Sequence, residues 1–309
     1  MEWMGRGKMQ ESFSIRVLTL KDRSSLIELF MDYESNVYGE IQTSEEEIEE
    51  MLKSIPESDR RGLWHDGELA AISILTEKDH RLPSLVMANP TDQMNRYIVE
   101  MVNELVSSAK SGKKTGNETK TLILSANLEV EKRAFEECGF IPTRYWFQMK
   151  KDLENLTIPA TPSPYTISSF NPATETHDLH ELFEEVFSDH FDYHPTELEE
   201  FKQRFLRPSF DPTLWYLLKD GDQLVGFILC SVNHDTKMGE VTHLGIKRNL
   251  RRNGLAHLLL YYAFWELEGR GMKTAALSVD SDSYTDATIV YQKAGMYVFR
   301  GFTRYDLKV

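Results

Sequence analysis

The spacing of apolar residues changes at one point in the chain, and the change marks a strand followed by a helix. Residues 240–246 alternate loosely between polar and apolar and are rich in side chains that suit a pleated surface, which predicts a strand. From residue 255 to residue 265, Leu255, Leu258, Leu259 and Tyr262 recur at helical spacing. The pattern therefore predicts a strand, a short turn and a helix in succession.

The turn between these two elements, Arg251-Arg252-Asn253-Gly254, has the chemistry of an anion site. The first amide groups of a helix have no partner within the helix, and the helix dipole adds partial positive charge there. Gly254 lacks a Cβ atom and allows the backbone to approach a ligand closely. A pyrophosphate suits such a site, and an ordinary loop with solvated arginines is the alternative.

The two halves of the chain repeat one pattern with an offset of about 155 residues. In each half an extended segment, beginning at Phe13 or Tyr165, leads into an amphipathic helix. A hairpin with an Asp-Gly turn follows. Near the end of each half a helix stops at a glycine, Gly139 or Gly295, as helices with a left-handed C-terminal residue do.

This repeat predicts an α/β (α+β) fold with two tandem domains. Each domain is expected to hold a mixed central sheet with a parallel strand–helix–strand core, flanked by helices. A proline-rich segment separates the halves and suits a linker. The expected limits are a disordered tail over residues 1–10, a first domain over 11–154, a linker over 155–164 and a second domain over 165–309.

Composition limits the expected partners and compartment. The formal net charge of −14 over 309 residues disfavours nucleic acid as a partner. The sequence has no apolar run of the roughly 18 residues that a membrane helix needs, and its first residues lack the apolar stretch of a secretory signal. Cys138 and Cys230 fall in different halves and suit small buried positions. We expect a cytoplasmic protein, a monomer or homodimer, that binds neither nucleic acid nor membranes.

The segment from Arg251 to Ala256, after a strand that ends in Leu-Gly-Ile, resembles the Arg/Gln-x-x-Gly-x-Gly/Ala signature of the GNAT (GCN5-related) N-acetyltransferases. The resemblance implies acetyl-CoA as cosubstrate and no metal. It also implies that the turn holds the pyrophosphate and that the pantetheine arm lies beside the strand like an added strand. The cofactor-binding residues implied in this way are Leu244, Gly245, Ile246, Arg251, Arg252, Asn253, Gly254, Leu255, Ala256 and His257.

Two residues are candidates for the proton transfers that amide formation needs. Glu240 opens the predicted strand, where the family often has a glutamate base, and Tyr291 lies on a late helix where many members have an acid. On strict alternation Glu240 shares a side of the strand with Leu244 and Ile246, and His243, the rival base, faces the other way unless a bulge re-aims it. A solvated glutamate and a packed core tyrosine are the alternatives.

The two halves are not equivalent. The first half has no glycine where Gly254 stands in the second, and Phe135 occupies the position of Tyr291. A phenyl ring cannot donate a proton, so we expect a degenerate first domain, with a structural or substrate-shaping role, and catalysis in the second. Within the second half, Ser283 stands where the family usually has asparagine.

The acceptor is expected near the first two helices of the second half, where the family lines its acceptor pocket. The candidate residues there are Asp189, His190 and Tyr193, together with His243. The tandem layout resembles the mycothiol synthase branch, whose members acetylate a cysteinyl amine. The implied function is acetyl transfer to the primary amine of a small molecule, with a cationic acceptor favoured by the acidic balance.

Two other functions are weighed against this one. The histidine spacings match no recognised zinc pattern, so no metal site is predicted. A tandem protein that binds acyl-CoA as a sensor or interaction module, without turnover, is the alternative to an enzyme.

Overall fold

The structure is a computed structural model that describes residues 13–78, 81–111, 119–207, 210–282 and 287–309. Contacts divide these residues into two compact units, each with its own hydrophobic core. Unit 1 comprises the described residues up to Arg144 together with Phe302–Val309, and unit 2 comprises those of Tyr145–Gly301. The expected disordered tail, residues 1–10, lies outside the described residues.

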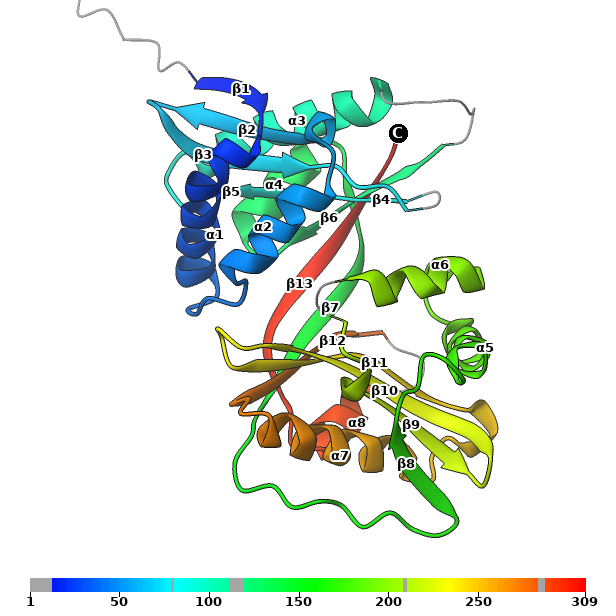
Figure 1. Ribbon diagram of the computed structural model, residues 1–309. Coiled ribbons are helices and arrows are strands. Elements are labelled where there is room, and N and C mark those ends of the chain that lie inside the picture. The colour runs from blue at the N-terminus through cyan, green and yellow to red at the C-terminus, as the bar shows by residue number, and fades with distance from the viewer. Residues whose placement is uncertain (1–12, 79–80, 112–118, 208–209, 283–286) are drawn as a thin grey trace, which may run out of the picture. The chain divides into compact units, whose positions relative to one another are not determined.

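Unit 1 packs four helices against strands (Figure 1). One antiparallel sheet has the order β1-β2-β3-β5, while β6 pairs in parallel with β4 and antiparallel with the last part of β13. The elements are β1 (Phe13–Val17), η1 (Leu20–Asp22), α1 (Arg23–Val37), α2 (Glu45–Ser54), η2 (Glu57–Asp59), β2 (Arg60–His65), β3 (Glu68–Ile74), β4 (Arg81–Pro83), β5 (Leu85–Ala88), α3 (Met94–Ser111), β6 (Thr121–Ala126) and α4 (Glu129–Glu137).

Unit 2 is built around a mixed sheet in which β12 lies between the last part of β7 and β11, followed by β10, β9 and β8. The β11–β12 pair is parallel, and the other pairs in this series are antiparallel. The elements are β7 (Ile141–Asp152), β8 (Tyr165–Ser169), α5 (Thr176–Phe187), α6 (Leu198–Lys202), η3 (Gln203–Leu206), η4 (Pro212–Leu214), β9 (Trp215–Asp220), β10 (Gln223–Asn233), β11 (Met238–Ile246), η5 (Arg248–Leu250), α7 (Leu255–Gly269), β12 (Thr274–Asp280), α8 (Ala287–Lys293) and β13 (Tyr297–Lys308).

Helices α5 and α7 cover opposite faces of this sheet. A Cβ atom placed on Gly245 would meet Val186 of α5, whereas one placed on Gly239 would meet Leu267 of α7. Five side chains of α7 are fully excluded from water and pack into the core of the unit: Leu259, Leu260, Ala263, Phe264 and Leu267. Of the residues whose spacing predicts this helix, Leu255 and Leu259 are buried, whereas Leu258 and Tyr262 are half-buried and pack against the core.

The main sequence-based expectations of the fold are confirmed. Both units are mixed α/β structures, and the helices before Gly139 and Gly295 end with these glycines at φ of 87° and 84°. Gly139 and Gly295 thus adopt the left-handed conformation that glycine tolerates best. Cys138 and Cys230 are free thiols, half-buried and buried respectively. Across the described residues, the structure has no helix long and apolar enough to cross a membrane.

The closing strands differ from the expected arrangement. Successive halves predict that each domain ends with its own strand, but Trp146–Asp152 of β7 pairs with β12 of unit 2. Likewise, Thr303–Lys308 of β13 pairs with β6 of unit 1. Each long strand thus contributes residues to both units, and the contact division differs from the expected limits at 154 and 165. Alternation along a strand specifies its buried face and does not identify the partner strand, so this exchange cannot be predicted from the sequence.

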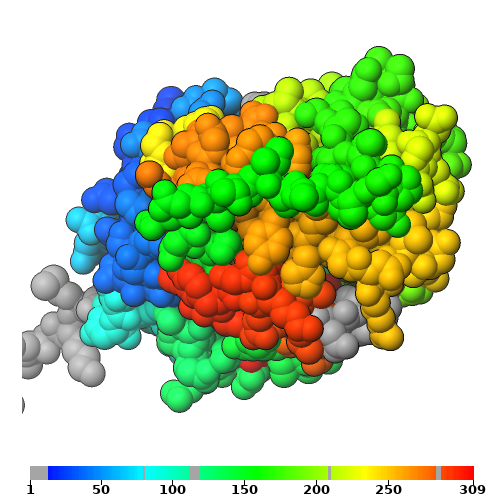
Figure 2. All heavy atoms as spheres, turned by 90° about the horizontal axis from the view of Figure 1, so that it is seen from below, coloured from blue at the N-terminus to red at the C-terminus, as the bar shows by residue number. Residues whose placement is uncertain are grey.

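Residues 155–164 contain no helix or strand, as a linker should, yet they belong to unit 2. The amide of Leu156 donates to the Glu268 carboxylate at 2.9 Å, and the Leu156 side chain packs on the core of the unit. In Figure 2 this green segment runs over the surface of the orange residues around α7. It is an extended surface strap of unit 2.

Candidate functional site

Strands β11 and β12 separate beyond their first three residues. Their parallel register pairs Met238 with Thr274, Gly239 with Ala275 and Glu240 with Ala276, and continues no further among the described residues. The remaining part of β11, from Val241 to Ile246, keeps β10 as its neighbour on the other side. One edge of this part of β11 is therefore not paired with β12.

The backbone of this edge faces the gap at Leu244 and Ile246. The Lys247 amide donates to the Val225 carbonyl of β10 at 2.9 Å. Because successive residues of a strand present their amide and carbonyl groups to opposite sides, those of Leu244 and Ile246 face away from β10. The Ile246 carbonyl accepts a hydrogen bond from Arg251 Nε at 3.2 Å. The backbone amide and carbonyl of Leu244 are therefore the groups of this edge that are more available to a ligand.

The turn after β11 presents a row of amide groups at the start of α7. Within the described residues, the first helical bond runs from Leu258 to the Gly254 carbonyl, and the amides of residues 252–257 have no acceptor. Gly254 has φ of 80°, and a Cβ atom there would meet nothing within 4 Å. Uncommitted amides, positive φ and open space are the properties that an anion requires of a helix start.

Two arginines of this turn hold it to the C-terminal end of α5. The Arg251 guanidinium donates to the Val186 carbonyl at 3.3 Å as well as to Ile246. Arg248 pairs with Asp189 at 2.8 Å. These two arginines therefore bind protein groups, whereas the side chain of Arg252 is exposed to solvent.

A bulge in β11 changes the direction of the candidate bases. His243 pairs with Leu229, and Val241 pairs with Cys230, so Thr242 is the extra residue. This extra residue places Glu240 on the same face of the sheet as His243, whereas strict alternation puts them on opposite faces. The expectation that Glu240 shares its side with Leu244 and Ile246 is thus wrong.

The face that carries Glu240 and His243 is the one covered by α5, and aromatic rings line it. The His243 ring lies 5.0 Å from that of Phe183 and 5.6 Å from that of Phe187, centroid to centroid. His190 packs on Phe187 from the loop after α5, at 4.7 Å. The structure therefore brings His190 and His243 to one aromatic cluster, with Glu240 on the same face.

Burial lowers the pKa of His190 below its usual range, and the nearby Arg251 acts in the same direction. Asp280 and Asp189 oppose this shift. A histidine with a lowered pKa is neutral at pH 7 and can accept a proton. His190 thus joins Glu240 and His243 as a group able to take a proton from an amine.

Tyr193 and Asp189 are held by protein partners. The Tyr193 hydroxyl donates to the Glu184 carboxylate, which also accepts from the Thr196 amide at 3.2 Å. Asp189 is the ion-pair partner of Arg248. Both residues thereby order the loop that follows α5.

Tyr291 lies half-buried on α8, a short helix that contacts α7 and β12. Burial raises the pKa of its phenol to about 12, so the group is protonated at neutral pH. Its hydroxyl bonds to no residue that the structure describes. In unit 1, Phe135 occupies the corresponding place and is 1% exposed, wholly within the core. Ser283, the residue in the asparagine position, lies outside the described residues.

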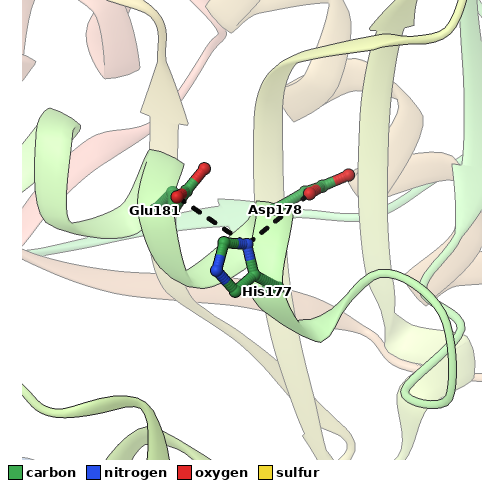
Figure 3. Close-up of side chains that lie close together, drawn as sticks. All are labelled: His177, Asp178 and Glu181. Carbon is green, nitrogen blue, oxygen red and sulfur yellow. Dashed lines mark ion pairs between the residues drawn. The ribbon is translucent and has the colours of Figure 1, made fainter.

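One group of side chains has the composition of a metal site, but its position argues against that role. His177, Asp178 and Glu181 lie together on the first turns of α5, and their ion pairs measure 3.9 Å and 3.7 Å (Figure 3). All three are exposed to solvent. An exposed histidine with a carboxylate next to it and another four residues later is ordinary for a helix surface, and nothing else among the described residues points to a cation.

Sequence reasoning overlooked one charged residue on this face, Arg204 of η3. Its guanidinium lies over the Phe183 ring at 4.6 Å and the Phe201 ring at 5.0 Å. The surrounding run of aromatic and basic residues matches no motif. The only sign of this role of Arg204 in the sequence is its position between the apolar residues of an amphipathic stretch.

Comparisons with known proteins agree with this arrangement. Residues 176–296 match the family model described as the Acetyltransferase (GNAT) family. The chain is 29% identical to a mycothiol acetyltransferase of Streptomyces bingchenggensis over 148 residues, which cover 48% of this chain and 46% of that protein. For the mycothiol acetyltransferase of Thermobispora bispora the identity is 27% over 201 residues, or 63% of this chain and 66% of that protein. The chain spans about half the length of the first curated relatives it matches.

Solved structures extend the likeness of fold to the whole chain. A GCN5-related N-acetyltransferase from Sphaerobacter thermophilus superposes with a TM-score of 0.82 at 22% identity, covering 96% of this chain and 95% of that one. A tandem GNAT protein from the clavulanic acid biosynthesis pathway has a TM-score of 0.73 at 10% identity, covering 96% and 98%. The splayed strands, the amide-lined turn and these matches lead to one conclusion: residues 176–296 are similar to the GNAT acetyltransferase family, and the fold of the whole chain is similar to that of tandem GNAT proteins.

Proposed function

We propose that this protein transfers an acetyl group from acetyl-CoA to the primary amine of a small molecule, and that unit 2 carries the catalysis. The observation that carries the proposal is the row of uncommitted amides at residues 252–257, next to the unpaired edge of β11. A pyrophosphate fits the amides, and an extended amide-containing arm fits the edge. Unit 1 has Phe135 in place of Tyr291, which supports a non-catalytic role for it.

Residues on the α5 face supply the proton acceptors that this reaction needs. The amine nitrogen attacks the thioester carbon, so a C–N bond forms, the C–S bond breaks and one proton leaves the nitrogen. Glu240 is the proposed base, acting directly or through water, with His243 as the rival. Tyr291, protonated because burial raises its pKa to about 12, donates to the departing thiolate. The Leu244 amide faces the gap in the sheet, which supports a role for it in polarising the thioester carbonyl.

Calorimetry with acetyl-CoA tests the first half of this proposal. The wild type should bind one acetyl-CoA per chain, and Gly254→Glu should abolish binding because it adds bulk and negative charge among the amides. The matched control is Gly221→Glu, at the β9–β10 turn of the same unit, where φ is also positive and no atom lies within 4 Å of a Cβ. Wild-type protein without affinity for acetyl-CoA would remove the proposal.

Thiol release with a panel of amines tests the second half. We expect turnover with at least one amine, and a fall of roughly 100-fold or more in kcat for Glu240→Gln and for Tyr291→Phe. Acetyl-CoA affinity should stay unchanged in both variants. Binding at one site without turnover of any amine would instead favour the acyl-CoA sensor.

A further inference from the structure

Arg204 brings a positive charge to the inner side of the α5–α6 region. It lies on η3, directly after α6, and its guanidinium stacks on Phe183 and Phe201 at 4.6 Å and 5.0 Å. These two rings are 6% and 0% exposed. The guanidinium is therefore held against the aromatic cluster that also contacts His243, and it is partly shielded from water.

This charge has no partner at bonding distance among the residues that the structure describes. No carboxylate lies within 4.0 Å of the guanidinium, and its nitrogens donate no hydrogen bond to a described group. Glu184 and Glu200 act on it only from further away, and one oxygen of Glu184 is committed to Tyr193 and Thr196. Burial and the neighbouring Arg207 both lower the pKa of Arg204. A guanidinium remains charged even so, and a partly desolvated one favours an added anion.

The distance from Arg204 to His243 suits a small molecule. The Arg204 guanidinium and the His243 ring lie on the same Phe183 ring, at 4.6 Å and 5.0 Å from its centroid, so they are at most about 9.6 Å apart. His243 shares its face of the sheet with Glu240 because of the bulge at Thr242. One molecule of modest length can therefore place an amine near His243, on the face of the sheet that also carries Glu240, and an anionic group on Arg204.

We propose that the acceptor is an amine that also carries an anionic group, a carboxylate or a phosphate, and that Arg204 is the residue that binds this group. The inference rests on the proposed function, because it assigns the substrate class of that same site. A guanidinium binds either anion through two parallel hydrogen bonds. This class differs from the purely cationic acceptor that the acidic composition favours, because Arg204 would contact the ligand directly, whereas charges more than a Debye length away are screened.

Matched pairs of amines, differing only in the anion, test the inference. Phenylalanine against phenethylamine reports on a carboxylate, and phosphoethanolamine against ethanolamine reports on a phosphate. We expect the wild type to prefer one anionic member in kcat/KM. We expect Arg204→Gln to lose roughly 10- to 100-fold of that preference, the range of a charge-assisted hydrogen bond. Arg204→Lys should restore part of it, and Arg207→Gln, the exposed neighbour, should change nothing.

Binding measurements keep this test separate from that of the proposed function. Calorimetry of each amine, with CoA present as the product that cannot react, reports affinity without turnover. Anion preference that depends on Arg204, in a protein that turns over no amine, would refute the acetyltransfer and keep the anion site. Equal affinities within both pairs, or an unchanged preference in Arg204→Gln while it still binds acetyl-CoA like the wild type, would overturn the inference.

Discussion

The Arg251 guanidinium donates to the backbone carbonyl of Val186 at 3.3 Å, near the last turn of α5. The same side chain donates to the Ile246 carbonyl at 3.2 Å. One arginine therefore connects the end of β11, the turn before α7 and the helix that covers the other face of the sheet. In this structure Arg251 positions the row of amides at the start of α7.

Replacing Arg251 by alanine should weaken both stability and cofactor binding. Loss of two hydrogen bonds from a charged, half-buried donor is expected to cost about 1–3 kcal/mol in the free energy of unfolding. The turn should then be less ordered, and the Kd for acetyl-CoA should rise. Urea unfolding and calorimetry measure the two effects. Arg252→Ala is the control, because its exposed side chain should affect binding through charge alone and leave stability unchanged.

Gly254→Ala and Gly221→Ala should have similar effects on stability and different effects on binding. Both glycines have positive φ, 80° and 59°, with open space around the position of a Cβ. Each alanine is expected to cost about 1 kcal/mol of backbone strain. We expect a rise in the Kd for acetyl-CoA only for Gly254→Ala. Equal affinities in the two variants would count against the turn as the pyrophosphate site.

Gly245→Ala should destabilise unit 2 through overpacking. A Cβ atom there would lie 2.5 Å from the Phe227 ring and 3.0 Å from Val186. We expect a loss of about 1–3 kcal/mol. The double variant Gly245→Ala, Phe227→Leu should lose less than the two single changes combined. Gly269→Ala, at the end of α7 with no atom near its Cβ, should be neutral or slightly stabilising.

The phenol of Tyr291 should stay protonated far above neutral pH. Its pKa is about 12 in the folded protein, against an ordinary value of 10.0. Because the folded pKa is the higher one, its contribution to stability is fully present below pH 10 and is lost as the pH rises to 12. Ultraviolet difference titration of wild type against Tyr291→Phe checks this. A tyrosinate signal from Tyr291 that is complete by pH 10 would show that burial does not raise its pKa.

Local sequence patterns predicted the strand–turn–helix and the glycine-ended helices, because each depends on residues close together in the chain. The turn could be predicted because Gly254 and the helix start after it act through their own backbone. The face of the sheet on which the Glu240 side chain lies could not be predicted, because the bulge at Thr242 depends on the pairing of β11 with β10 and has no local signal in the sequence of β11. The position of Arg204 depends on rings from α5 and α6, which only the fold brings together.

The exchange of closing strands has a consequence for how the chain is made. Unit 2 is a single run, Tyr145–Gly301, but β6 of unit 1 receives its β13 neighbour from residues that follow all of unit 2. During synthesis, β6 of unit 1 therefore lacks its β13 neighbour, and its sheet edge stays open, until all of unit 2 has been made. An open edge is a template for unwanted pairing. Truncation after Gly301 should therefore destabilise unit 1, because it removes Phe302–Val309, although it leaves unit 2 and the residues of unit 1 up to Arg144 in place.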